Sequence, residues 1–455
     1  MSYHSTRGRA PSIAFADVLL TGLAPDGGLY VPEQWPTSAP AVAGRGYAAF
    51  AADVMWPFVE GSVERDAFES IVADAYATFD HPEVVPVSTL PDGIGLVELF
   101  HGPTLAFKDV AMQLLGRLFD YELAKRGSTV TIVGATSGDT GSAAIEAFRG
   151  RANVRIVILH PHGRTSEVQR RQMTTVVAPN VRNVAVEGTF DDCQDMVKAM
   201  FGDEQFRQDV GLAAVNSINW ARVMAQVVYY HWASQRFAER DETLDVVVPT
   251  GNFGNVFAGR VAKRMGAPID RFVVASNRND ILTQFFADGA MTIGEVEPSL
   301  SPSMDIQVSS NLERLIHELL GGDGAQVEAL LRTFRAEGHI RMDESIRTRV
   351  GELWAGESLS DEQTLEVIAD VYQESGVLLD PHSAVAVGAA RRRSSANRQI
   401  VMATAHPAKF PDAVETATGI RPDLPPGLAD LFERDEHYDV APNDLDAVKA
   451  LVKSA

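Results

Sequence analysis

Continuous apolar runs alternate with helix-like segments through most of the chain. Five runs are rich in β-branched residues and have the length of buried strands, and the stretches between them carry apolar residues at helical spacing. Strands that are apolar on both faces and alternate with helices are typical of a parallel sheet covered on both sides. The predicted strands are residues 129–133, 154–159, 245–248, 271–275 and 399–403.

The pattern differs before and within this α/β region. Residues 1–95 contain a turn-rich segment and two predicted helices, 48–59 and 66–79. Residues 301–376 are predicted to be largely helical, and we interpret them as an insertion packed on the sheet.

Composition narrows the possible partners. The chain has 455 residues and a formal net charge of −21, which argues against nucleic acids and anionic membranes as partners. An anionic substrate would therefore need a local basic pocket. Cys193 is the single cysteine, so no intrachain disulfide can form. Because no signal core, membrane-length apolar run or metal motif occurs, we expect a cytoplasmic protein without a metal ion.

Lys108 stands at the predicted start of a helix, among apolar residues on both sides. The helix N-terminus is its positive end, so both this position and desolvation would lower the pKa of a lysine. A lysine with a lowered pKa is suited to forming a Schiff base. The alternative is a surface lysine whose stem covers apolar residues.

Polar loops follow the predicted strands, where open α/β sheets bind their ligands. Residues 251–255, Gly-Asn-Phe-Gly-Asn, join a strand to a helix and predict a phosphate cradle of backbone N–H groups. Residues 136–141 occupy the same kind of position and would suit a carboxylate, unless Ser137 or Asp139 simply caps the helix. Arg222 lies in the first turn of a further predicted helix, 221–233, and either faces an anion or is exposed without a role.

Five segments together resemble the threonine synthases, in particular the longer branch found in fungi and proteobacteria. They are His-Gly-Pro-Thr-Leu-Ala-Phe-Lys-Asp (101–109), Ser-Gly-Asp-Thr-Gly (137–141), Asn-Ser-Ile-Asn-Trp-Ala-Arg (216–222), Gly-Asn-Phe-Gly-Asn (251–255) and Thr-Ala-His-Pro-Ala-Lys-Phe (404–410). The resemblance covers nearly the whole chain.

The resemblance implies the tryptophan synthase β-like fold, that of fold type II pyridoxal phosphate enzymes: α/β, with two open, mostly parallel sheets flanked by helices. The implied division is an N-terminal region (1–95), a smaller α/β domain with the cofactor lysine (96–220) and a larger α/β domain (221–455) that contains the helical insertion.

The resemblance also implies pyridoxal 5′-phosphate as the cofactor, with Lys108 as its Schiff-base lysine. Asp139 is expected near the phenolic oxygen of the cofactor and to share a proton with it; capping of the following helix is the alternative. Thr404 is expected at the pyridine nitrogen. The cofactor phosphate is assigned to Gly251, Asn252, Phe253, Gly254 and Asn255.

Substrate contacts follow from the same resemblance. The substrate carboxylate is assigned to Thr136, Ser137, Gly138 and Thr140, and Thr140 is expected to act in catalysis beside Lys108. The substrate phosphate is assigned to Asn216, Ser217, Arg222 and Lys409.

The implied reaction converts O-phospho-L-homoserine and water to L-threonine and phosphate by β,γ-replacement, the last step of threonine biosynthesis. Two alternatives remain open. A serine or threonine dehydratase of the same fold would not need Arg222 and Lys409, and a non-catalytic phosphometabolite-binding protein would not need a Schiff-base lysine. The expected partner is a small-molecule substrate, with no nucleic acid or membrane, and the expected assembly is a monomer or homodimer.

Overall fold

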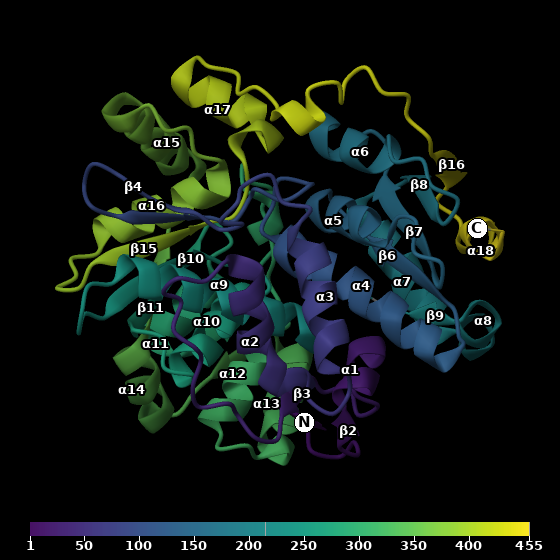
Figure 1. Ribbon diagram of the computed structural model, residues 1–455, viewed down its shortest axis with the longest axis horizontal. Helices are drawn as coiled ribbons and strands as arrows, with labels where there is room; N and C mark the ends of the chain where they lie inside the picture. Colours follow the sequence, from purple (N-terminus) through teal and green to yellow (C-terminus); the bar gives the residue numbers. More distant parts are fainter. Residues whose placement is uncertain (214, 455) are drawn as a thin grey trace.

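The computed structural model describes residues 1–213 and 215–454 and contains two mainly parallel sheets, which lie on the left and right of Figure 1. All five strands predicted from the apolar runs are present. The larger sheet has the order β14 (Trp354–Ser358), β11 (Ile269–Ser276), β10 (Leu244–Pro249), β15 (Gln399–Ala403), β5 (Gly95–Glu98), β4 (Val87–Thr89), and only β4 is antiparallel. The smaller sheet has the order β16 (Asp439–Pro442), β8 (Val181–Glu187), β7 (Val154–Pro161), β6 (Val130–Ala135), β9 (Leu212–Ala213).

Two small antiparallel sheets, eighteen α-helices and three short 3₁₀ helices complete the described part of the chain. The small sheets are β2 (Ile13–Ala14), β1 (Ser2–Ser5), β3 (Tyr30–Pro32), and β12 (Ala290–Thr292), β13 (His339–Arg341). The α-helices are α1 (Phe15–Thr21), α2 (Tyr47–Val59), α3 (Arg65–Tyr76), α4 (Lys108–Arg126), α5 (Asp139–Phe148), α6 (Glu167–Thr174), α7 (Phe190–Gly202), α8 (Glu204–Val210), α9 (Trp220–Phe237), α10 (Gly254–Arg264), α11 (Ile281–Asp288), α12 (Leu312–Leu319), α13 (Gly324–Glu337), α14 (Glu344–Leu353), α15 (Asp361–Ser375), α16 (Pro381–Arg392), α17 (Pro411–Thr418) and α18 (Leu445–Lys453). None of the helices within residues 1–213 and 215–454 has the length and apolar character needed to cross a membrane.

Alternate side chains of the central strands pack into different cores, one on each face of the sheet. In β10, Val246 and Val248 belong to a central core that also includes α4 and α9, whereas Val247 faces α15 and α16 on the other side. In the smaller sheet, Ile156 faces the central core and Val157 faces α7 and α18. Successive side chains point to opposite faces of a strand, so a continuous apolar run supplies two cores at once.

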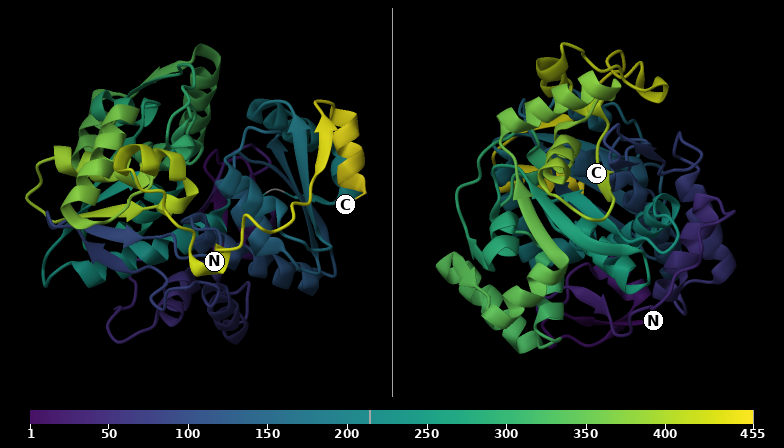
Figure 2. Two further views of the ribbon diagram at one scale, coloured as in Figure 1. Left: turned by 90° about the horizontal axis from the view of Figure 1, so that it is seen from above. Right: turned by 90° about the vertical axis from the view of Figure 1, so that its left-hand side faces the viewer.

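The chain crosses between the two sheets more than once. Strands β4 and β5 precede or straddle residue 96, yet they belong to the larger sheet. The C-terminal segment leaves the larger sheet after α17 and adds β16 and α18 to the smaller one, as the yellow trace in the left view of Figure 2 shows. The sheets therefore do not divide at single points near residues 96 and 220.

The segment 301–376 is not helical throughout. It contains α12 to α15, but β14 within it pairs in parallel with β11 and extends the larger sheet. This strand contains Gly356, where a Cβ atom would lie 2.7 Å from the Cα of Thr283, so α11 packs directly on the strand backbone. An edge strand with glycine at its centre lacks the continuous apolar run on which the helical prediction depended.

Candidate active site

The candidate site is a cavity at the carboxyl ends of β10 and β15, between the two sheets. Its wall combines the loop after β10 with residues from α4, α5, α9 and α16 and with Ser303, Met304 and Thr404 from two connecting segments. The lining residues are Phe107, Lys108, Thr140, Ser217, Arg222, Gln226, Pro249, Thr250, Gly251, Asn252, Phe253, Gly254, Asn255, Ser303, Met304, His382 and Thr404. This is the edge at which open α/β sheets bind ligands.

Backbone pairing brings Lys108 next to Thr404. The amide of Phe107 donates to the carbonyl of Thr404 (2.8 Å), and the amide of His406 donates to the carbonyl of Leu105 (3.0 Å). Two segments almost three hundred residues apart thus meet at one wall of the cavity.

Lys108 is the first residue of α4 and is 8% exposed. Its Nζ lies 3.1 Å from Asp139 Oδ2 and 3.4 Å from Ser303 Oγ. Burial lowers the pKa of Lys108; the charges of Lys409 and Arg222 act in the same direction, and Asp139 opposes them. The surface-lysine alternative is therefore wrong, because this amine is enclosed among site residues.

Asp139 accepts hydrogen bonds from several sides and does not cap a helix. Its Oδ2 contacts Lys108 and Ser303, and its Oδ1 contacts Gln169 Nε2 (2.8 Å) and Lys409 Nζ (2.9 Å). Although burial alone would raise the pKa of this carboxyl, Lys108 and Lys409 hold it well below its usual range. The N-cap of α5 is Gly138, without a side-chain hydrogen bond, so the capping interpretation of Asp139 is wrong. The Asp139 carboxyl thus lies between the side-chain nitrogens of Lys108 and Lys409, a placement that favours its ionised form over the proton sharing expected from the sequence.

The loop 251–255 has the form of an anion cradle at the start of α10. Phe253 takes a left-handed conformation (φ 64°) at the N-cap, and a Cβ on Gly251 would lie 2.6 Å from the carbonyl oxygen of Ser303. The hydroxyls of Tyr229 and Tyr230 both donate to Asn255 Oδ1, at 2.6 and 2.8 Å. Asn255 Nδ2 is buried and has no hydrogen-bond partner among the described residues. The two tyrosines thus fix the amide so that its donor remains free.

The loop 136–140 contributes less to the cavity than its sequence suggested. Thr136 Oγ1 accepts the amides of Gly138 and Gly141, both at 2.9 Å, so its hydroxyl shapes its own loop. Ser137 is exposed, and a Cβ on Gly138 would lie 2.4 Å from Gln169 Cδ. Of the four described residues assigned to the substrate carboxylate, Thr140 alone lines the cavity.

The four residues assigned to the substrate phosphate separate into two groups. Ser217 and Arg222 line the cavity, whereas Asn216 is partly buried beside it, with an unpaired Oδ1 among the described residues. Lys409 is fully buried and donates to Thr104 O (2.6 Å) and Gln172 Oε1 (3.0 Å) besides its ion pair with Asp139. The expectation that Lys409 contacts substrate phosphate does not fit this placement, because its three donors are already used by protein acceptors.

Arg222 is the contrasting cation. It is 4% exposed, and its Nε and Nη1 have no hydrogen-bond partner within residues 1–213 and 215–454. Burial lowers the pKa of Arg222 to about 10, so the guanidinium is still charged at neutral pH. A buried guanidinium with unpaired donors on a cavity wall is a ready partner for an anionic ligand.

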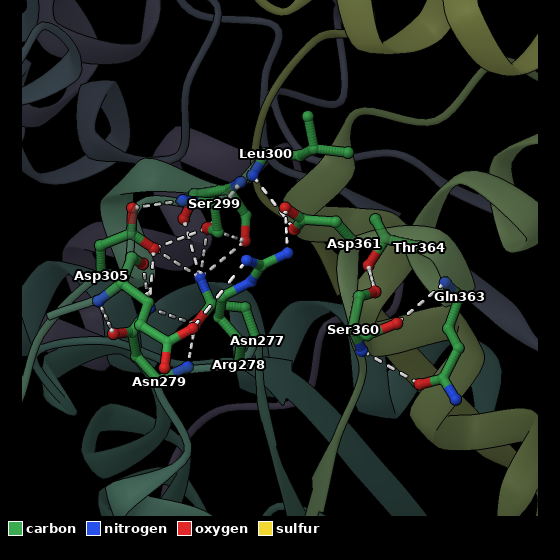
Figure 3. A network of polar contacts seen from close by, with 12 residues as sticks. Asn277, Arg278, Asn279, Ser299, Leu300, Asp305, Ser360, Asp361, Gln363 and Thr364 are labelled. Carbon is green, nitrogen blue, oxygen red and sulfur yellow. Dashed lines mark hydrogen bonds and ion pairs between the residues drawn. The ribbon is translucent and has the colours of Figure 1, made fainter. Parts of the chain in front are cut away.

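Ser303 is a site residue that sequence reasoning missed. A network of polar contacts holds the segment that carries it (Figure 3): Asp305 Oδ1 accepts hydrogen bonds from Asn277 Nδ2 (2.7 Å), Asn279 Nδ2 (3.1 Å) and Ser299 Oγ (2.6 Å). The amide of Leu300 donates to Asp361 at the start of α15 (3.2 Å). The asparagines after β11 were visible in the sequence, but nothing there indicated that they fix a distant segment against Lys108.

Three family models match successive parts of the chain. They are described as "Threonine synthase N terminus" (residues 2–76), "Pyridoxal-phosphate dependent enzyme" (94–345) and "Threonine synthase, C-terminal" (383–452). The middle model alone spans more than half of the 455 residues.

Similar proteins and structures agree with these matches. The chain is 52% identical to a threonine synthase of Pseudomonas aeruginosa, over 99% of this chain and 98% of the relative. It is 39% identical to that of Saccharomyces cerevisiae, over 99% and 94%. The crystal structure of PLP-bound threonine synthase from Brucella melitensis superposes with a TM-score of 0.97 at 48% identity, covering 100% of this chain and 99% of that one. That of the yeast enzyme gives 0.93 at 37% identity, covering 99% and 98%.

Proposed function

The chain belongs to the threonine synthase family of pyridoxal-phosphate-dependent enzymes, and from this premise we propose how the residues of its cavity divide the work of the reaction. Its activity is that of a threonine synthase, and its cofactor is pyridoxal phosphate. The proposed substrates are O-phospho-L-homoserine and water, which give L-threonine and phosphate.

The cavity has features that fit the cofactor. The free Nδ2 of Asn255 and the amides at the start of α10 would bind its phosphate, and Lys108 would hold its carbonyl carbon. Thr404 and Asp139 would lie at the ring, with Asp139 beside its phenolic oxygen. When bound, pyridoxal phosphate supplies an electron sink for charge that develops on the substrate carbons.

Arg222 is the observation on which the proposed phosphorylated substrate depends. Its unpaired guanidinium lies on the same wall as Ser217 and in the same cavity as Lys108, so one small molecule can reach both. We assign to Arg222 and Ser217 the phosphate of phosphohomoserine, and to Thr140 and neighbouring amides its carboxylate. Arg222 then stabilises the phosphate as it leaves, because charge-assisted hydrogen bonds strengthen as negative charge grows.

Lys108 is the proposed base and acid of the reaction. Its lowered pKa favours an amine that takes a proton from the substrate α carbon and returns protons along the carbon chain. Asp139 and Ser303 lie within 3.4 Å of its Nζ and would hold the amine between these steps. Enclosure by the segment 299–305 would keep bulk water from competing with the directed addition of one water molecule.

We propose a domain division that follows the sheets. The larger α/β domain then comprises residues near 86–100 and 221–420, and the smaller one comprises residues near 104–213 and the C-terminal β16 and α18. Residues 1–85 remain the N-terminal region.

One experiment tests the assignment against its rivals. Purified holoprotein is reduced with borohydride, and the labelled lysine is identified by mass spectrometry; phosphate release and threonine formation from phosphohomoserine are measured in parallel. We expect label at Lys108 and equal amounts of both products. A dehydratase would instead form an oxoacid and ammonia from serine or threonine, and a non-catalytic phosphometabolite-binding protein would form no product. Label at a different lysine would contradict the role of Lys108.

A further inference from the structure

Lys409 and Lys108 share one carboxylate. Lys409 Nζ lies 2.9 Å from Asp139 Oδ1, whereas Lys108 Nζ lies 3.1 Å from Asp139 Oδ2. Lys409 is 0% exposed, and its other contacts are the carbonyl of Thr104 and the side chain of Gln172. Its hydrogen bonds are therefore complete before any ligand arrives.

We propose that Lys409 is a positioning residue, the permanent counter-ion of Asp139, and not a ligand of the substrate phosphate. The inference rests on the proposed function, in which Lys108 gives up its ion pair whenever it holds the cofactor or a substrate proton is moved. Without a second cation, Asp139 would then be an uncompensated buried charge, which is strongly unfavourable. Lys409 takes no part in the chemistry, so it keeps Asp139 in place and ionised throughout, which differs from the shared proton that the sequence led us to expect.

A consequence is that Asp139 and Lys409 together carry no net charge beside the cofactor. The pair presents an oriented carboxylate oxygen to the ring without adding net charge to the site. Other ionisable groups around it are His382, which faces Asp139, Arg222, which lies near Lys108, and Asp109 and His406, which lie near Lys409. Asp109 accepts hydrogen bonds from the amide (2.8 Å) and hydroxyl (2.6 Å) of Thr104. Burial lowers the pKa of His406 to about 4, so His406 is neutral at pH 7.

The first arm of the test is a double-mutant cycle on the full chain without cofactor. Asp139→Asn leaves two buried ammonium groups unpaired and should lower Tm by on the order of 5 °C. Lys409→Met should lower the Tm of the wild type but raise that of Asp139→Asn, because the double variant buries no charge at this position. Lys449→Met, which removes a lysine paired with Asp203 far from the cavity, is the control and should not interact with Asp139→Asn. Additive losses in the double variant would overturn the pairing.

The second arm uses the absorbance of the lysine-bound cofactor as a function of pH. Lys409→Met leaves an extra negative charge, which favours the protonated chromophore and should raise the titration midpoint by about one pH unit. Asp139→Asn should lower it by a similar amount, and the double variant should lie near the wild type. A merely structural role for Lys409 would not produce shifts of opposite sign that cancel.

The two arms separate this inference from the proposed function. If borohydride does not attach cofactor to Lys108, the proposed function fails, yet the cycle without cofactor still decides whether Lys409 and Asp139 are a pair. If Lys409→Met leaves the absorbance midpoint unchanged and weakens the binding of inorganic phosphate more than tenfold, Lys409 is a phosphate ligand and the inference is overturned.

Discussion

Arg222 and Lys409 are two buried cations at the same site, but they differ in what their donors contact. Lys409 is fully buried and bonded to a carboxylate, a carbonyl and an amide oxygen. Arg222 is almost as buried, yet its Nε and Nη1 have no partner in the described chain. The family resemblance assigned both to a substrate phosphate; the placement of Lys409 does not fit that role, whereas the role of Arg222 stays a proposal.

The difference shows that hydrogen-bond satisfaction, more than burial or charge, separates a structural cation from a ligand-binding one. A buried donor left unpaired costs free energy of about 1–3 kcal/mol, and more when it is charged, so proteins retain such groups mainly where a ligand completes them. Lys409 already has its complement of acceptors and stabilises Asp139. Arg222 lacks acceptors for its Nε and Nη1 among the described residues, and it lines the cavity.

The largest expected effect concerns Lys108, whose amine is influenced by the charges of both cations. Lys108→Ala should reduce threonine formation by at least about a thousandfold, because the proposed function assigns both the Schiff base and the proton transfers to this one amine. Its Tm should change little, because Lys409 still compensates Asp139. Activity is measured as threonine formed, and Tm by calorimetry. A strongly destabilised Lys108→Ala chain would show that Lys409 alone is not a sufficient counter-ion for Asp139.

Local sequence predicted the buried framework well and its periphery poorly. Strands such as β10 are buried on both faces, so each appears in the sequence as a continuous apolar run that can be recognised without knowing its neighbours. The edge strand β14 could not be predicted in this way, because it has one strand neighbour and needs Gly356 only where α11 crosses it. Strand β16 joins the smaller sheet after a long excursion, and its position depends on tertiary contacts.

For the site, the sequence predicted which loops gather but not which acceptor each donor meets. Residues 251–255 form the predicted turn between a strand and a helix, because this geometry is local to one segment, and their binding of the cofactor phosphate stays a prediction. The contacts of Thr136 with its own loop and of Lys409 with Gln172 depend on packing between segments, which residue type does not reveal. The same holds for the two tyrosines of α9, whose hydroxyls reach Asn255 from a different helix.

The next largest effect is expected when the unpaired cation, Arg222, is replaced. Arg222→Leu should lower kcat/KM for phosphohomoserine about a hundredfold, because the dianionic phosphate loses its charge-assisted donors. The absorbance change that L-serine produces in the bound cofactor should persist, since serine carries no phosphate. Arg236→Leu, in the last turn of the same helix, is the matched control and should leave both unchanged. Equal losses with both ligands would indicate that Arg222 only supports the fold.

A smaller effect is expected at the other anion site, where the orientation of Asn255 is held by protein donors. Replacing both Tyr229 and Tyr230 with Phe should raise the Kd of pyridoxal phosphate about tenfold, the size of one lost hydrogen bond, because the amide can then rotate. Either single variant should do less, since one hydroxyl still holds Oδ1. Tyr47→Phe is the control, because its buried hydroxyl has no partner among the described residues. Unchanged affinity in the double variant would show that Asn255 needs no such support.

The smallest expected effect is on the stability of the cofactor-free chain, and it tests whether Arg222 is unpaired without measuring catalysis. Burial lowers the pKa of Arg222 to about 10, below its unfolded value, so the folded chain bears a desolvation cost of about 3 kcal/mol while the group is charged. Both states keep the proton at pH 7–9, so this cost is constant there and falls only as pH rises through the folded pKa. Arg222→Leu should therefore raise the Tm of the cofactor-free chain by about 2–4 °C, equally at pH 7 and pH 9. Inorganic phosphate should raise the Tm of the wild type by about half as much, because binding to the folded state adds RT ln(1 + [L]/Kd), about 1.4 kcal/mol at ten times Kd. The same phosphate should add little to Arg222→Leu. Equal stabilisation of both proteins by phosphate would show that the anion binds at a different place and does not contact Arg222.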